Sequence, residues 1–297
     1  MLGHGLAVFF ALLAAIFAAV GIVVRQRATL DVPAEKGVST VMLMTLLRRK
    51  LWWAGTGAAV AGYAFQALAL GYGSLLLVQP VLVSALLFAL PLSARLAGRR
   101  VTRGEWLWAL VLTAALTVFV ALAKATAGDY DIPVTLTVLV VAVSVAVVLA
   151  SVALAVRSTD WRRAVLLAVG VGVLFGLVAV LTKIVMHMVT EGHFVSALTT
   201  PALYLVLILG VAATLLQQSA FHAGSLQTSV PTMLVLEPVI AVVLGAIVLG
   251  EHMQITGVEP VALTAAAFAM VAATVALGRQ EGAYEEKLEA EMAQRTS

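Results

Sequence analysis

The sequence lacks cysteine and is poor in charged residues. Because it has no Cys, disulfides, thiolate metal sites and cysteine nucleophiles are excluded. Asp, Glu, Lys and Arg make up only 11% of the 297 residues, whereas 62% are hydrophobic. Soluble domains carry roughly 25% charged and 45–50% apolar residues. With a mean hydropathy of +1.08, this chain has too much apolar surface for water, and we predict a membrane protein.

Signatures of catalysis are missing as well. The sequence shows no nucleophile–base motif, phosphate-binding loop or zinc-ligand spacing. We therefore expect no enzymatic activity, no metal site and no cofactor. The net charge is +3, but the basic residues cluster between apolar runs, where they orient membrane helices. The expected partners are thus the lipid bilayer and a small-molecule or ion substrate, with no nucleic acid.

What the sequence does contain is a series of apolar runs of about twenty residues, each long enough to cross a bilayer as a helix. They cover residues 4–25, 51–71, 74–95, 104–123, 132–156, 163–186, 202–222, 227–249 and 258–278. These runs predict an all-α polytopic membrane protein with about nine transmembrane helices. The apolar stretch 38–47 is too short to cross and is expected to be interfacial or re-entrant.

The basic residues predict the orientation of these helices. If the N-terminus is outside, all Lys and Arg except Lys124 and Lys183 fall in the cytoplasmic segments 25–50, 95–103 and 157–163 or in the C-terminal tail. Cytoplasmic loops carry this excess in membrane proteins. All five Trp lie near the same helix ends. We predict a multi-pass protein of the cell membrane with the N-terminus outside and the C-terminus cytoplasmic.

Two pairs of segments are similar at one common offset. SLLLVQPVLVSALL (74–87) aligns with TMLVLEPVIAVVLG (232–245), and LLAAIFAAVGIVVRQ (12–26) aligns with GVGVLFGLVAVLTKI (170–184). The first pair matches Gln79-Pro80 with Glu237-Pro238, and both prolines are expected to break their helices. Five predicted helices precede the second copy, so it enters the membrane in the opposite direction. This arrangement is a 4+1+4 inverted repeat, which is typical of secondary transporters with a substrate site near the midplane.

The repeat divides the chain into four parts. They are a first transmembrane repeat (1–123), a linker with the extra helix 132–156 (124–160), a second inverted repeat (161–279) and a charged cytoplasmic tail (280–297). The tail alternates in charge, which favours a solvated helix or a disordered segment.

Glu237 is the strongest candidate for function. A carboxylate in hydrocarbon is costly, so it should be protonated or face a polar cavity. Two alternatives stay open: a proton-coupling site, or a protonated side chain that caps carbonyls freed by Pro238. Its repeat mate Gln79, followed by Pro80, is polar but uncharged. Gln79 is expected either to face Glu237 across the cavity or to bond to a neighbouring helix.

A polar stripe is predicted on one later helix. Thr214, Gln218, His222 and Ser225 recur at helical spacing, and Tyr63 and Gln66 form a smaller version in the first repeat. Such stripes either line a cavity or make hydrogen bonds between helices. His222, near a cytoplasmic helix end, is either a titrating group or a solvated boundary residue.

Two basic side chains fall at matching ends of repeated helices. Arg25 and Lys183 align with each other, and snorkelling of both side chains to the headgroups is the simpler explanation. Gating or contact with an anionic substrate is the alternative. The nearby His187, Glu191 and His193 are too irregularly spaced to predict a metal site.

Several segments resemble known transporters. LEPVIAVVLGAIVLGE (236–251) resembles the end-of-repeat signature of the drug/metabolite transporter superfamily, in particular its EamA branch. LWWAGTGAAVAGYAFQALA (51–69), QTSVP (227–231) and the predicted helix count are similar to NIPA-type proteins. The resemblance implies an inverted-repeat transporter with a central cavity and alternating access. The NIPA resemblance also implies Mg²⁺, but Gly62-Tyr63 stands where that pattern has an acidic residue after the glycine.

The leading hypothesis is a secondary active transporter of a small metabolite or amphipathic compound, coupled to protons through Glu237. The alternatives are a NIPA-like magnesium transporter, a flippase for lipids or lipid-linked sugars, and a non-transporting membrane scaffold that docks partners through its tail. A homodimer is left open.

Overall fold

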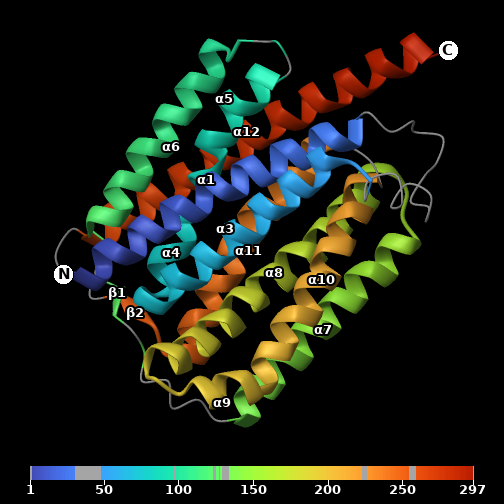
Figure 1. Ribbon diagram of the computed structural model, residues 1–297. Helices are drawn as coiled ribbons and strands as arrows, with labels where there is room; N and C mark the ends of the chain where they lie inside the picture. The colour runs from blue at the N-terminus through green and yellow to red at the C-terminus, as the bar shows by residue number, and fades with distance from the viewer. Residues whose placement is uncertain are drawn as a thin grey trace.

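The chain folds into an elongated bundle of helices (Figure 1). This computed structural model describes residues 2–30, 48–96, 98, 100–122, 125–126, 128, 134–222, 226–253 and 259–296. The predicted interfacial stretch 38–47 lies outside the described residues.

Each predicted span overlaps a described helix, although the span 74–95 comprises two helices and α9 lies between predicted spans. The described helices are α1 (Leu2–Leu30), α3 (Lys50–Tyr72), α4 (Leu75–Leu82), α5 (Ala85–Leu96), α6 (Arg103–Leu122), α7 (Val134–Val156), α8 (Asp160–Thr190), α9 (Phe194–Thr199), α10 (Pro201–His222), α11 (Leu226–Leu249) and α12 (Glu259–Thr296). Two short strands, β1 (Ala125–Thr126) and β2 (His252–Met253), pair antiparallel. The tail continues α12 as a helix, which is one of its two predicted forms.

Seven spans in the described part of the chain are long and apolar enough to cross a membrane, which makes this a polytopic membrane protein. They belong to α1, α4 with α5, α6, α7, α8, α11 and α12. The other two predicted spans are also helices. The 23 residues of α3 include several Gly and a Lys, and the apolar part of α10 covers only Pro201–Gln217.

The predicted span 74–95 is not one continuous helix. Pro80 has no N–H to donate, so it interrupts the hydrogen-bond ladder inside α4. One turn later the chain tightens: the Ser84 amide donates to the Val81 carbonyl at 3.0 Å, and the Leu87 amide donates to the Ser84 carbonyl at 2.9 Å. Residues 83–84 therefore separate α4 from α5.

The next helix begins at a capping box. The Thr102 amide donates to the Glu105 carboxylate at 2.6 Å, and the Glu105 amide donates to the Thr102 hydroxyl at 3.2 Å. Two otherwise unpaired amides at the start of α6 are thereby satisfied.

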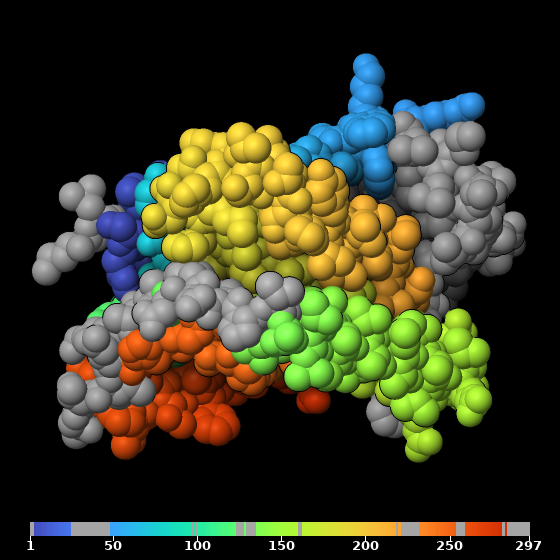
Figure 2. Space-filling model, turned by 90° about the horizontal axis from the view of Figure 1, so that it is seen from below, coloured from blue at the N-terminus to red at the C-terminus, as the bar shows by residue number. Residues whose placement is uncertain are grey.

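Helix α8 lies at the centre of the bundle. Within its membrane-length segment 83% of the residues are buried, against 22% to 44% in the other six spans. It packs against α3, α7, α10 and α11. In contrast, α7 and α10 lie on the surface seen in Figure 2 and present large apolar side chains outward, among them Leu149 and Ile208. In a polytopic protein such a surface suits contact with lipid.

One end of the bundle holds the start of α1, the α3–α4 turn, α9 and the paired strands (Figure 1). We call it the strand end. The turn between α5 and α6 and the C-terminal end of α12 lie at the opposite end. The segments predicted to be outside the membrane thus gather at the strand end.

Candidate functional site

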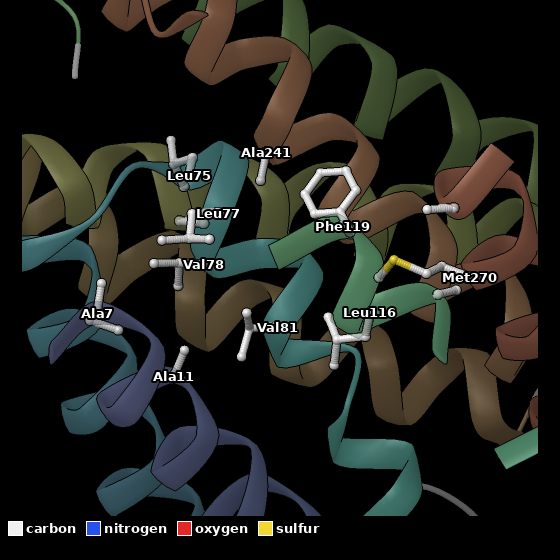
Figure 3. Packing of buried hydrophobic residues seen from close by; sticks show 14 of the residues in the cluster. Ala7, Ala11, Leu75, Leu77, Val78, Val81, Leu116, Phe119, Ala241 and Met270 are labelled. Atoms are coloured by element: carbon white, nitrogen blue, oxygen red, sulfur yellow. The ribbon is translucent and has the colours of Figure 1, made fainter. Parts of the chain in front are cut away.

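Helices α4 and α11 pack directly against each other and carry the two aligned Pro motifs. A Cβ atom on Gly245 would lie only 3.0 Å from Leu75 Cδ1, so glycine permits this close approach. Ala241, fully buried one turn earlier on α11, belongs to the same apolar cluster as Leu75 and Val78 (Figure 3). The contact brings together the helices that carry Gln79 and Glu237.

Gln79 is buried, with 1% of its surface exposed, and its Nε2 has no hydrogen-bond partner. The adjacent Pro80 is buried as well. Amide groups buried in proteins are normally paired, so an unpartnered one requires an explanation such as an unseen water or ligand. Among the described residues, the Gln79 Nε2 makes no hydrogen bond to a neighbouring helix, which was one of its two predicted roles.

Glu237 is half-buried on α11. It precedes Ala241 by one helical turn and therefore shares its stripe. Its backbone lies against α8, because a Cβ atom on Gly172 would be 3.3 Å from the Glu237 nitrogen. No hydrogen bond or ion pair joins its carboxyl group to another residue in the described ranges. Helix α11 runs from Leu226 to Leu249 through Pro238, so the helix break expected at this proline is not found.

The remaining predicted site residues lie on α3 and α10. Tyr63 is 48% exposed and stacks on Phe175 of α8, with ring centroids 6.4 Å apart. Gln66 is half-buried. The Thr214 hydroxyl donates to the Gly210 carbonyl of its own helix at 2.9 Å, a bond within the helix. The side chains of Gln218 and His222, and all of Ser225, lie outside the described residues.

The snorkelling explanation for Lys183 is wrong. Lys183 is 4% exposed, and its ammonium donates to the Leu70 carbonyl at 2.6 Å and to the Gly73 carbonyl at 2.8 Å. These carbonyls lie at the end of α3, where helix hydrogen bonds run out. They attract the ammonium inward in place of lipid headgroups. The side chain of Arg25, its repeat mate, lies outside the described part of the structure.

Glu251 completes this cluster from the other side of the turn. It is 2% exposed, and its carboxylate accepts hydrogen bonds from the Leu75 amide at 3.1 Å and the Leu76 amide at 3.3 Å. It thereby caps α4, at the end where a helix attracts negative charge. Lys183 and Glu251 also attract each other electrostatically. We call these two side chains and their backbone partners the charge clamp.

Glu251 is the functional candidate that sequence reasoning missed. It ends the segment LEPVIAVVLGAIVLGE, two residues after the predicted span 227–249, and the sequence pattern did not single it out. Burial raises the pKa of its carboxyl group above the ordinary value, although Lys183 and the two amides act in the opposite direction. Desolvation is therefore the stronger influence on this carboxylate.

A polar pocket of about 290 Å³ opens beside the charge clamp at the strand end. Its lining includes His4, Tyr72, Ser74, Lys183, His187 and Glu191. Ser74 occupies the N-cap position of α4, but its hydroxyl makes no capping bond. Since Glu251 caps the helix instead, the buried Ser74 hydroxyl has no partner.

Comparison with known proteins gives one informative relative. An uncharacterized protein of Corynebacterium glutamicum is 38% identical over 274 residues, which cover 92% of this chain and 95% of the relative. No family model matches the chain, and no solved structure matches it. At this identity and coverage, the chain belongs to the same family as the corynebacterial protein.

Proposed function

We propose that this protein is a secondary active transporter of a small metabolite or amphipathic compound, coupled to protons through Glu237. We further propose that it has nine transmembrane helices and is related to the EamA branch of the drug/metabolite transporters. Its polytopic helical architecture is compatible with this function, and the resemblance of LEPVIAVVLGAIVLGE to that branch supports it.

The observation that carries the proposal is the contact between α4 and α11. Helix α4 ends at Leu82, within the predicted span 74–95, and it buries the amide of Gln79, whose Nε2 has no hydrogen-bond partner in the described part of the chain. Helix α11 carries Glu237, for which no partner is found in the described residues. Interrupted helices with polar groups near the midplane are the usual substrate sites of secondary transporters. Gln79 would select a substrate by hydrogen bonding, and Glu237 would exchange a proton.

The packing of the helices supports the inverted repeat. In the proposed scheme α1, α3, α4 with α5, and α6 correspond to α8, α10, α11 and α12. Helix α1 packs against α3 and α4, as α8 packs against α10 and α11, and α6 packs against α4, as α12 packs against α11. Close packing of α3 on α8 has no equally close counterpart between α10 and α1. A transporter open at one end only would show such asymmetry.

The positive-inside pattern supports a cell-membrane location with the strand end outside. In the described residues no group of three or more His, Cys, Asp or Glu is arranged to hold a metal ion, so no observation favours the magnesium alternative. The flippase and scaffold alternatives likewise have no specific observation in their favour.

The test begins with a thermal-shift screen of metabolites and divalent cations on detergent-purified protein, because ligands that bind the native state raise its apparent stability. The best compound then serves as the probe in vesicles with an imposed pH gradient. Glu237→Gln should reduce gradient-driven flux by about tenfold or more, as expected when a coupling carboxyl can no longer ionise.

Glu191→Gln provides the matched control, since this exposed carboxylate follows the end of α8 at the strand end and is not part of α4 or α11. It should leave the gradient-driven flux unchanged. A Glu237→Gln protein that elutes as one species and retains the same pH-driven flux would exclude the coupling role.

A further inference from the structure

Helices α5 and α6 follow each other in the chain but pack against different neighbours. Helix α5 packs mainly against α1, whereas α6 packs mainly against α12. A groove of about 110 Å³ lies between α5 and α6, near the turn that joins them opposite the strand end (Figure 1). Its lining includes Leu90 and Pro91 of α5 and Trp106, Leu110 and Thr113 of α6. The Thr113 hydroxyl donates to the Ala109 carbonyl of its own helix at 2.8 Å, so the groove is essentially apolar.

The groove opens outward, toward the surroundings of the bundle. Trp106 is 55% exposed and Leu110 is 63% exposed. Trp106 lies in the first turn of α6, and tryptophan at the end of a membrane helix marks the headgroup level. Thr113 follows seven residues later, which is about 10 Å deeper along the helix. The groove thus extends from the headgroup level into the hydrocarbon, where acyl chains are the molecules that can fill it.

Three exposed arginines surround the end of the groove that lies at the headgroup level. Arg95 lies one turn after Pro91 on α5, and Arg103 lies one turn before Trp106 on α6. Residues three or four apart share a helix face, so both arginines lie on the side of the groove. Arg100 lies in the turn itself, directly before a residue that lines the groove.

Little negative charge lies near these arginines in the sequence. Glu105 is the one acidic residue of the segment 85–113. It is 3% exposed, and its carboxylate accepts a hydrogen bond from the Thr102 amide at the start of α6. Within the described ranges the three arginine side chains form no hydrogen bond or ion pair with other residues. The headgroup end of the groove therefore carries positive charge that these neighbours leave unneutralised.

We propose that this groove is a binding site for one anionic phospholipid. An acyl chain lies in the groove beside Trp106 and Thr113, and the phosphate of the headgroup meets the three arginines. Arginine binds phosphate oxygens through two parallel N–H groups, and basic residues between membrane helices recognise anionic headgroups. Charge thus selects the lipid, because a zwitterionic headgroup carries no net charge to complement the arginines. The site is independent of the proposed transport function.

Trp106 makes the binding measurable by fluorescence, because bromine atoms on an acyl chain quench a nearby tryptophan. Full-length protein in detergent micelles is titrated with dibrominated phosphatidylglycerol or, separately, with dibrominated phosphatidylcholine. The signal of Trp106 is the part of the quenching that Trp106→Phe removes. Each arginine near an anionic lipid strengthens the attraction by about fivefold. Phosphatidylglycerol should therefore reach half-quenching at a concentration about 20-fold lower than phosphatidylcholine, or lower still.

Removal of two arginines tests the headgroup contact. Arg100→Gln combined with Arg103→Gln should reduce the preference for phosphatidylglycerol to about fivefold or less, since one arginine remains. Arg157→Gln combined with Arg163→Gln is the matched control, because these exposed arginines flank the turn between α7 and α8. This control should keep the native preference. Equal quenching of the native protein by both lipids, a preference that survives the loss of Arg100 and Arg103, or its loss in the control would overturn the proposal.

The position of the acyl chain is tested separately. Thr113→Phe should fill the groove and weaken the quenching of Trp106 by both lipids. Ala114→Phe, at the same depth on α6 but outside the groove lining, should leave it unchanged. Undiminished quenching in Thr113→Phe would contradict a lipid in the groove.

Two other occupants would give different results. A second copy of this chain would make the Trp106 signal depend on protein concentration, and the acidic tail 280–297 would permit a lipid preference only after its removal. Either result would overturn the proposal. The thermal midpoint gives a second measurement that needs no tryptophan, because a bound lipid stabilises the native state. Phosphatidylglycerol should raise the midpoint of the native protein more than phosphatidylcholine does, and this difference should shrink in the variant without Arg100 and Arg103.

Discussion

Two acidic residues of one segment, Glu237 and Glu251, lie in different surroundings. Glu251 follows the end of α11, accepts two amide hydrogen bonds and lies near a buried ammonium. Glu237 lies within α11, half-buried and without such partners in the described ranges, and the neighbouring α4 contributes the unpartnered amide of Gln79. Polar groups with partners hold a structure together, whereas buried groups without partners are suited to bind something else. The strand end is therefore the more fully bonded of the two regions, and the α4–α11 contact is the region that we propose for binding.

Replacement of Lys183 should lower the stability of the protein more than any other substitution considered for these two regions. Lys183→Met keeps a side chain of similar length, but it leaves the Glu251 carboxylate and two backbone carbonyls buried without the cation. Lys183 and Glu251 are buried charges that attract each other, and removing one of two such charges costs up to about 3–5 kcal/mol. The midpoint of thermal unfolding in detergent should fall sharply, whereas Lys50→Met, at an exposed position, should leave it nearly unchanged.

Combining Lys183→Met with Glu251→Gln sharpens this prediction. If the two charges stabilise each other, the double variant should be more stable than Lys183→Met alone, because no uncompensated carboxylate remains. Strictly additive losses in free energy would show that they act independently.

Replacement of Gln79 should change the stability less than Lys183→Met does, and in the opposite direction. Gln79→Leu removes a buried amide whose Nε2 has no partner, and an unsatisfied buried group costs about 1–3 kcal/mol. The variant should unfold at the same temperature as the native protein or a higher one. Its binding of the probe compound in the thermal-shift assay should weaken, because the hydrogen-bonding group is lost. If the variant is less stable and binds the probe compound as well as the native protein does, Gln79 has a structural role, as Glu251 does, and no role in binding.

The pH dependence of stability should show the smallest effect. Since burial raises the pKa of Glu251 in the folded state, the folded protein binds this proton more tightly than the unfolded chain does. Its contribution to stability is greatest below the unfolded pKa of about 4.3 and is lost as the pH rises through the folded pKa. Thermal midpoints of the native protein and Glu251→Gln should therefore diverge with pH over that window. Parallel curves would refute a raised pKa.

Much of the fold follows from the sequence because membrane helices need only length and apolarity. The predicted run 104–123 corresponds to α6 and the run 132–156 to α7. A helix break was predicted at Pro80, and the structure interrupts the run 74–95 one turn later, at residues 83–84. Apolarity alone does not distinguish a straight helix from a broken one, because the tightened turn at residues 83–84 depends on carbonyl pairing as well as on composition.

The candidate site was less accessible to sequence reasoning. Glu237 and Gln79 stood out because a polar residue within an apolar run is unusual by itself. Lys183 and Glu251 did not stand out, since each lies near a predicted helix end, where charged residues are common and normally reach water. Their partners are backbone groups of Leu70, Gly73 and Leu75, which have no signature in the sequence.

The sequence by itself determined that the protein belongs in lipid, roughly which segments are helical, and where the basic residues lie along the chain. These properties depend on the transfer of single segments from water to hydrocarbon, which is a sum over residues. Only the tertiary structure decided that a lysine and a glutamate from the second half hold the α3–α4 turn of the first. That outcome depends on distances between residues more than a hundred positions apart, and electrostatic and hydrogen-bond energies exist only once folding has set those distances.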